Sequence, residues 1–308
     1  MPTDIYSCRR HTFFIIYYFF FILLGVSPLN YNLKGKYMPK IIKIDDISAP
    51  ELNVYARLTE SQLKNNEGLF VAESVKVIKV ALQKGLEPVS FLMEERQIDG
   101  IGKELIECCP DVPVYTASRE VLSAITGFEL TRGLLCVMNR PQNAALEDVL
   151  KNAKRVAVLE RLSDAMNVGA IFRSAAALGI DAVLLFNNCS EPLNRRTVRV
   201  SMGSVFLVPW AFFEKESFPN PENAVEYLKQ NGFTTAALAL KDDTININNE
   251  ILKNSEKLAL FLGSEGDGLS DETINACDYT VKIPMHHDVD SLNVAAAAAV
   301  TFWELSNK

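Results

Sequence analysis

The chain has 308 residues, a hydrophobic content of 48% and a formal net charge of −7. It is long enough for two modest domains with apolar cores. The negative charge argues against a protein that coats nucleic acid non-specifically, because such binding rests on many phosphate contacts, although it allows a local basic groove. The six cysteines include no CxxC pair, so neither a disulfide framework nor a zinc site is indicated.

The first 37 residues differ in character from the rest. Arg9 and Arg10 precede an apolar run at residues 12–26, a combination that resembles a signal peptide or a short anchor. The run is shorter than the roughly 20 residues that a spanning helix needs. We favour a third interpretation, in which Met38 is the true start. The protein would then be cytoplasmic, and would meet a membrane only if residues 1–37 are retained.

Residues 38–140 have the alternating pattern of a small α/β domain. Apolar residues at helical spacing predict a helix over residues 73–84, which ends at Gly85. Short apolar runs predict the other elements. The predicted strands are residues 69–71, 89–93, 112–115 and 134–138. Residues 141–152 begin with a polar, proline-marked stretch, and we interpret them as a linker.

From residue 153 to residue 308 the alternation becomes regular. Near-continuous apolar strands between helices are typical of a parallel sheet that is covered on both faces. In such sheets ligands bind beyond the carboxyl ends of the strands. The alanines at residues 295–299 predict a closely packed helix face. The predicted strands are residues 156–159, 182–186, 205–208, 235–240, 258–262 and 279–283, and the predicted helices are residues 168–178, 221–230, 271–276 and 292–305.

A first polar constellation follows the first strand of this half. We expect Asn167 to cap the following helix, Gly169 to allow a close backbone approach, and Arg173 to lie in the second helical turn. An arginine with small and apolar neighbours near a strand end is well placed to bind phosphate. The alternative is an ordinary cap and a solvated or ion-paired arginine, and this segment alone does not decide between them.

A glycine-rich loop directly follows the apolar strand at residues 258–262. Gly263, Gly266 and Gly268 permit close approach of a ligand to the main chain. Their GxxGxG spacing differs from the GxGxxG fingerprint of dinucleotide-binding proteins, which argues against a nucleotide-dependent oxidoreductase. A glycine loop alone is a weak sign of a ligand site. Glu265 is a stronger sign, because a carboxylate between two glycines is a poor packing residue.

A third constellation lies where the last strand breaks at Pro284 and a polar loop leads into the alanine-rich helix. Ser291 and Asn293 open that helix. Either Ser291 is a helix cap and Asn293 is incidental, or the two form part of a ligand clamp. His286 and His287 are adjacent and therefore point in different directions, so a solvated loop explains them better than a metal site.

Together, in this order, the three constellations resemble the SpoU/TrmH family of RNA 2′-O-ribose methyltransferases, within the SPOUT superfamily. The resemblance covers about residues 153–308. The family's first motif matches Asn167, Gly169 and Arg173, its second matches Gly263, Glu265, Gly266 and Gly268, and its third matches Ser291, Leu292 and Asn293.

The resemblance implies a particular α/β fold. The domain at residues 153–308 would be a parallel-sheet α/β knot of the SPOUT type, threaded as a deep trefoil. Residues 38–140 resemble, more loosely, the family's small RNA substrate-binding domain of L30e-like fold. Ser74 and Arg132 depart from the glycine and glutamine expected there. Family members are typically homodimers with the active site near the dimer interface.

The resemblance also implies a chemistry. The protein would transfer a methyl group from S-adenosylmethionine to a ribose 2′-hydroxyl of rRNA or tRNA, without a metal. A catalytically inactive RNA-binding protein of the same fold is the alternative. The catalytic group would be Asn167, Arg173, Glu265, Ser291 and Asn293. The cofactor would lie against Leu238, Gly263, Glu265, Gly268, Ile283 and Leu292. The basic group Arg195, Arg196 and Arg199 is either an RNA phosphate track or an ordinary solvated surface.

Overall fold

The computed structural model describes residues 39–46, 49–55, 68–126, 133–241, 243–264, 266–287 and 291–306. They belong to one compact unit, Pro39–Lys308. The predictions for residues 1–37, Arg132 and Glu265 lie outside the described residues. Within the described ranges, the structure has no helix of the length and apolar character needed to cross a membrane.

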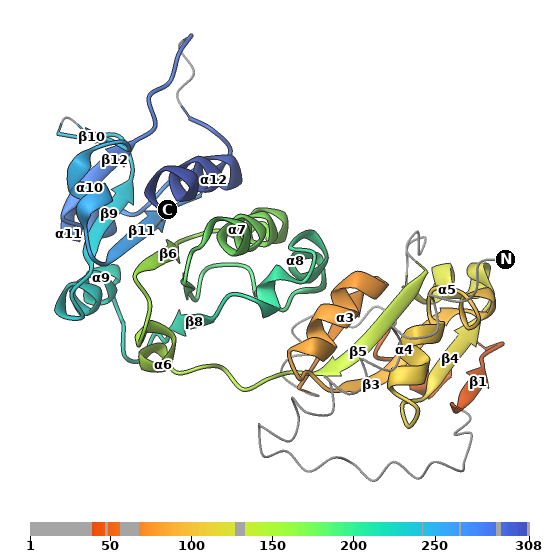
Figure 1. Ribbon diagram of the computed structural model, residues 1–308. Helices are drawn as coiled ribbons and strands as arrows, with labels where there is room; N and C mark the ends of the chain where they lie inside the picture. Colours follow the sequence, from red (N-terminus) through yellow and green to blue (C-terminus); the bar gives the residue numbers. More distant parts are fainter. Residues whose placement is uncertain are drawn as a thin grey trace, which may run out of the picture. The chain divides into compact units, whose positions relative to one another are not determined.

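A five-stranded mixed sheet lies in the first half of the chain (Figure 1). Its strand order is β1-β4-β3-β5-β2. β5 is antiparallel to β2 and to β3, whereas β4 is parallel to β3 and to β1. The predicted strands and helix are confirmed with small shifts of their ends, whereas β1 was missed. The elements are β1 (Ile41–Lys43), η1 (Pro50–Leu52), β2 (Leu69–Glu73), α3 (Val75–Gln83), β3 (Pro88–Glu94), η3 (Glu95–Gln97), α4 (Lys103–Cys108), β4 (Val114–Ala117), α5 (Arg119–Thr126) and β5 (Leu134–Asn139).

Ser74, which joins β2 to α3, has an unusual backbone conformation. Its φ is 85° and its ψ is 145°, a region that is almost confined to glycine and costs other residues roughly 1–3 kcal/mol. Its hydroxyl makes no helix-capping hydrogen bond. The hydroxyl oxygen is also buried with no partner among the described residues. The conformation gives a physical reason for the glycine expected here.

We therefore expect Ser74→Gly to stabilise the fold. Removing the side chain relieves the backbone strain and the buried hydroxyl, which outweighs the extra chain entropy of glycine in the unfolded state. The free energy of unfolding should rise by about 1 kcal/mol. Urea denaturation measures it, with Ser118→Gly as the control, because Ser118 accepts a hydrogen bond from the Val121 amide and should lose stability. A lower midpoint for Ser74→Gly would contradict the expectation.

The second half forms a seven-stranded sheet in the order β10-β12-β9-β11-β6-β7-β8. Every pair in it is parallel, which confirms the predicted parallel sheet. The carboxyl ends of neighbouring strands therefore meet at one edge. The strands are β6 (Arg155–Leu159), β7 (Ala182–Phe186), β8 (Trp210–Phe213), β9 (Thr234–Leu238), β10 (Ile245–Asn246), β11 (Leu258–Leu262) and β12 (Tyr279–Lys282).

Helices cover both faces of this sheet. One apolar cluster joins the sheet to α7 and α12, which lie side by side in Figure 1, and another joins it to α6 and α9. The predicted packed face is confirmed only for part of the alanine run, since Ala298 is fully buried and Ala296 is exposed. The helices are α6 (Leu146–Leu150), α7 (Ala165–Leu178), α8 (Arg195–Val200), η4 (Ser204–Phe206), α9 (Pro221–Gln230), α10 (Glu250–Asn254), α11 (Asp271–Ala276) and α12 (Val294–Leu305).

The prediction of a strand at residues 205–208 was wrong. A turn of 3-10 helix, η4, begins after Gly203, whose φ is +84°, and the strand β8 starts only at Trp210. Val205 and Val208 are buried without being in a strand, because a short apolar run does not distinguish a strand from a buried helical turn. The helices α8 and α10 were missed, and α6 lies inside the expected linker.

Candidate functional site

A cavity of about 300 Å³ lies at the carboxyl ends of β9, β11 and β12. Its wall consists of the loops that follow these strands and the start of α12. This is the edge at which parallel sheets bind ligands. The described members of the predicted cofactor set all line the cavity: Leu238, Gly263, Gly268, Ile283 and Leu292.

The closed conformation of the glycine loop requires glycine at two positions, 263 and 268. A Cβ atom on Gly263 would lie 2.3 Å from the carbonyl carbon of Gly268 and 2.3 Å from the nitrogen of Leu269. Gly268 has a φ of +67°, and its amide donates to the carbonyl of Ser264 at 3.1 Å. Gly266 has open space around it. The folded loop lines the cavity with Gly263, Gly266 and Gly268, which have no side chains to cover the backbone, and with Ser264 and Asp267.

The caps of α12 and α7 are not the residues considered as caps from the sequence. Asn293 caps α12, and its Oδ1 accepts from the amides of Ala295 and Ala296 at 3.0 and 3.4 Å. Ser291, the cap in one of the two alternatives, instead lines the cavity. Asn167 is not a cap either, because α7 begins three residues before the predicted start. Asp164 caps it and accepts from the Met166 amide at 2.9 Å.

The first and third motifs meet directly. The Nδ2 atom of Asn293 donates to Oδ1 of Asn167 at 3.1 Å, across 126 positions in the sequence. Because Asn293 also caps α12, this bond joins the start of that helix to the first turn of α7. The structure therefore brings Asn167 and Asn293 together beside Ser291 and Leu292, which are cavity residues.

Arg173 stands apart from this group. It lies in the third turn of α7, one turn later than predicted, and its side chain is exposed. It does not line the cavity. Within the described part of the chain, no hydrogen bond or ion pair holds its guanidinium, so that group is available to a ligand. Helical spacing places Arg173 on the same face as Met166, Ala170 and Ala177.

Gly169 has a packing function. A Cβ atom on it would lie 2.8 Å from the carbonyl oxygen of Thr197 and 2.9 Å from Cβ of Val200. The close backbone approach predicted at this glycine is therefore to α8, a neighbouring helix. Gly169 positions the site indirectly, because α7 carries both Asn167 and Arg173.

Glu160 is a residue that the sequence analysis missed. Its carboxylate is almost fully buried at the end of β6. One oxygen accepts from the Ser270 amide at 3.2 Å and the other from the Thr273 hydroxyl at 2.6 Å. Ser270 follows the glycine loop and caps α11, so Glu160 holds the far end of the loop. The sequence feature that could have identified Glu160 is a carboxylate directly after a predicted apolar strand.

Two of the three predicted RNA-binding arginines are ion-paired within the chain. Arg195 donates to the buried carboxylate of Glu73 at 3.0 Å, and Arg199 lies 3.6 Å from the same oxygen. Arg196 is exposed. These contacts join the end of β2 to α8, so part of the basic group balances a buried charge.

The residues around the sheet edge offer neither a metal centre nor an activated thiol in the described ranges. No group of three or more histidine, cysteine or acidic side chains gathers there that could hold a metal ion. His286 and His287 are exposed. Burial raises the pKa of Cys189 to about 11, and its thiol donates to the carbonyl of Leu159 at 3.1 Å. That thiol is neutral near pH 7 and is a poor nucleophile.

The structure is that of an α/β protein with a cavity among the loops at the carboxyl edge of its parallel sheet. The SpoU rRNA Methylase family model matches residues 154–303. An uncharacterized tRNA/rRNA methyltransferase of Mycobacterium tuberculosis is 36% identical over 243 residues, which are 79% of this chain and 82% of that protein. The chain belongs to the SpoU methylase family.

Two further proteins show how far the likeness extends. The 23S rRNA (guanosine(2553)-2′-O)-methyltransferase RlmP of Bacillus subtilis is 25% identical over 264 residues, covering 85% of this chain and 98% of its own. The crystal structure of an AdoMet-bound rRNA methyltransferase from Sinorhizobium meliloti has a TM-score of 0.72 at 23% identity. It covers 86% of this chain and 97% of the other. That structure supports the fold.

Proposed function

We propose that this chain transfers the methyl group of S-adenosylmethionine to a ribose 2′-hydroxyl of rRNA or tRNA. The observation that carries the proposal is the meeting of the motifs at one sheet edge. Asn293 donates to Asn167, while Ser291 and the glycine loop line the adjoining cavity. The 2′-O activity in the name of the Bacillus subtilis relative supports the position of the methyl group.

The cavity suits the cofactor. Leu238, Ile283 and Leu292 give it apolar walls for an adenine ring. The loop closed between Gly263 and Gly268 leaves main-chain groups facing the cavity for the polar parts. When bound, S-adenosylmethionine supplies an electrophilic methyl group on a positively charged sulfur. Glu265 stays a predicted cofactor and catalytic residue.

In this proposal Arg173 acts as a phosphate clamp. A guanidinium stays protonated in proteins, so it is unsuited to remove the proton of the hydroxyl. Bound to an RNA phosphate beside the ribose, it would fix the nucleophile and stabilise the developing alkoxide. Asn167, Ser291 and Asn293 would orient the ribose and the cofactor, with the bond between the two asparagines fixing the geometry of both side chains.

We further infer the family's knot and its domain division. The chain returns after β12, and α12 packs against α7, the helix that follows the interior strand β6. This supports a chain end threaded back through the sheet edge. The two separate sheets support an L30e-like RNA substrate-binding domain before residue 141 and a methyltransferase domain after residue 152.

We also propose a homodimer that completes the active site. The outer faces of α7 and α12 carry few charges, and Met166, Val300 and Trp303 are exposed there at 51%, 41% and 59%. Exposed apolar side chains on neighbouring helices are typical of a protein interface. Arg173 lies on the same face of α7 as Met166, so a second copy that packs there would meet it.

Trp303→Glu should therefore dissociate the dimer. A carboxylate at the centre of an apolar interface is costly to bury, so the dissociation constant should rise by at least about 30-fold, or roughly 2 kcal/mol. Sedimentation equilibrium measures it. The matched control is Ile251→Glu on α10, where the side chain is 49% exposed, and it should leave the dimer intact. A wild-type monomer, or a dimeric Trp303→Glu variant, would refute this interface.

The enzymatic proposal is tested with the full chain, radiolabelled S-adenosylmethionine, and rRNA and tRNA transcripts. We expect label in RNA at positions that resist alkaline cleavage, because a 2′-O-methyl group blocks that reaction. Site-resolved mapping of total RNA with and without the gene then identifies the nucleotide. Label on a base would refute the 2′-O assignment. RNA binding without S-adenosylmethionine binding would favour the inactive RNA-binding alternative.

A further inference from the structure

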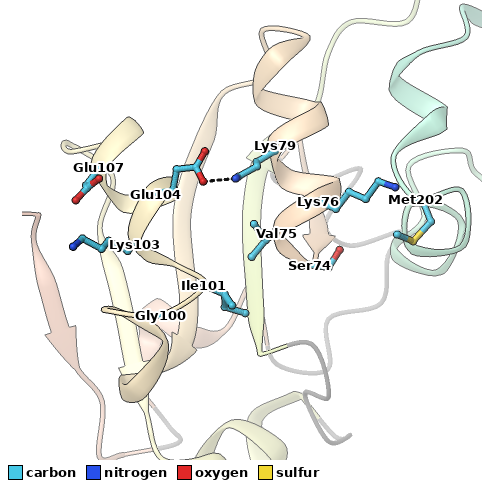
Figure 2. A pocket seen from close by; sticks show the side chains of 10 residues that line it. All are labelled: Ser74, Val75, Lys76, Lys79, Gly100, Ile101, Lys103, Glu104, Glu107 and Met202. Carbon is cyan, nitrogen blue, oxygen red and sulfur yellow. Dashed lines mark hydrogen bonds and ion pairs between the residues drawn. The ribbon is translucent and has the colours of Figure 1, made fainter. Parts of the chain in front are cut away.

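A second hollow lies away from the cofactor cavity, between α3 and α4. It has a volume of about 680 Å³, and Figure 2 shows the side chains that line it. Its wall includes Ser74 and Lys76 from the start of α3, Ile101 and Lys103 from the start of α4, and Met202 from the turn after α8. We call it the α3–α4 groove.

The groove has two lysines without an acidic partner among the described residues. Lys79 forms an ion pair with Glu104 across the groove, so these two charges cancel. Lys76 and Lys103 are exposed. Glu107 is the remaining acidic side chain in the wall, and α3 itself contains no acidic residue. The groove wall thus carries more positive than negative side chains, although the whole chain has a net charge of −7.

Ser74 gives the groove an unsatisfied hydrogen-bond donor. The residue is only 7% exposed, lines the groove, and its hydroxyl has no partner within the described structure. It is the N-cap residue of α3 but leaves the first-turn amides uncapped. Those amides and the partial positive charge of a helix start favour an anion. A strained residue whose buried hydroxyl has no hydrogen-bond partner among the described residues is a candidate for binding a ligand.

We propose that the α3–α4 groove binds a phosphate group of the RNA backbone. Lys76 and Lys103 supply the charge, and the Ser74 hydroxyl and the first amides of α3 supply the hydrogen bonds. The groove is larger than one phosphate needs, and the exposed Ile101 offers apolar contact to a sugar or base. Met202, which follows α8, forms part of the wall. A bound RNA strand would therefore contact the half of the chain with the five-stranded sheet and the half with the seven-stranded sheet. This inference rests on the proposed function, in which RNA is the substrate.

The first test neutralises the two lysines. The double variant Lys76→Gln/Lys103→Gln is compared with Lys151→Gln/Lys215→Gln, in which both lysines are exposed and lie outside the groove. A fluorescent oligouridylate is titrated at several salt concentrations. Loss of two phosphate contacts should reduce the slope of log K against log salt by about 1.4 and weaken binding about tenfold at low salt. The control pair should match the wild type.

The second test uses Ser74→Gly. This variant should bind the oligouridylate about tenfold more weakly, because a hydrogen bond to a charged group is lost, although its fold is more stable. Opposite changes in RNA affinity and stability separate a binding role from a structural one. With rRNA transcripts as substrate, the lysine variant should raise KM and leave kcat unchanged.

The outcomes distinguish this inference from the proposed function. If the wild type methylates RNA and the lysine variant keeps its affinity and salt slope, the groove proposal is wrong and the function stands. If the wild type methylates no RNA but its oligouridylate binding depends on the groove lysines, the function fails and the groove proposal stands. Failure of the wild type to bind the oligouridylate overturns the groove proposal. Unchanged S-adenosylmethionine titration and melting temperature confirm that the lysine variant is folded.

Discussion

Replacing Arg173 by alanine should lower kcat for RNA methylation by at least about 100-fold, the loss typical of removing a group that stabilises transition-state charge. The affinity for S-adenosylmethionine should change by less than about twofold, because sites without shared contacts act nearly independently. Arg173 is exposed on α7 and does not line the cavity. Single-turnover methylation and calorimetric titration of the cofactor measure the two effects separately.

Arg173→Lys is the matched control. It keeps the positive charge but loses the planar fork that binds phosphate through two hydrogen bonds. We expect intermediate activity, closer to alanine than to arginine. Wild-type kcat in the alanine variant would remove Arg173 from the catalytic group. An equal loss of cofactor binding would show instead that Arg173 helps to form the cavity.

Replacing Gly263 by alanine should disrupt the glycine loop at residues 263–268, which we propose contacts the cofactor. The added Cβ would lie 2.3 Å from main-chain atoms of Gly268 and Leu269, and main-chain atoms can give way only if the loop opens. Accommodating the added methyl group should lower the free energy of unfolding by about 1–3 kcal/mol. Since the same loop lines the cavity, the affinity for S-adenosylmethionine should fall by about tenfold to a hundredfold. Calorimetric titration measures the affinity, and urea denaturation the stability.

Gly266 provides a control in the same loop. A Cβ atom there has no neighbour within 4 Å, so Gly266→Ala should change stability by no more than about 0.5 kcal/mol, as exposed substitutions usually do. Its cofactor affinity should stay near that of the wild type. If the two glycine variants bind the cofactor equally well, the closed loop does not form the cofactor site.

Much of the fold was predictable because it depends on local patterns. The strands β7 and β11 and the helices α9 and α11 have the predicted bounds, since apolar runs and helical periodicity identify elements that are covered by a core. The glycine loop and the two asparagines were also found from the sequence, because the order and spacing of motifs are properties of the chain.

The helix starts at the site were predicted less well. Asp164 and Asn167 are both suitable caps, as are Ser291 and Asn293. Local sequence does not choose between them, because the first turn of a helix is fixed by its packing. α7 begins early enough to bury Ala165, and α12 begins where Val294 enters the core. Asn167 therefore does not cap α7, and its side chain accepts a hydrogen bond from Asn293.

The sequence by itself determined the class of fold, the elements that carry the site, and the three motifs, because each depends on residues close together in the chain. Only the tertiary structure decided which side chains meet. It joined Asn167 to Asn293, placed Arg173 outside the cavity, and paired Glu73 with Arg195, for which the sequence allowed either an RNA contact or a solvated surface. The reason is that such contacts join residues more than a hundred positions apart. Their distances depend on how whole helices and sheets pack, which no local pattern encodes.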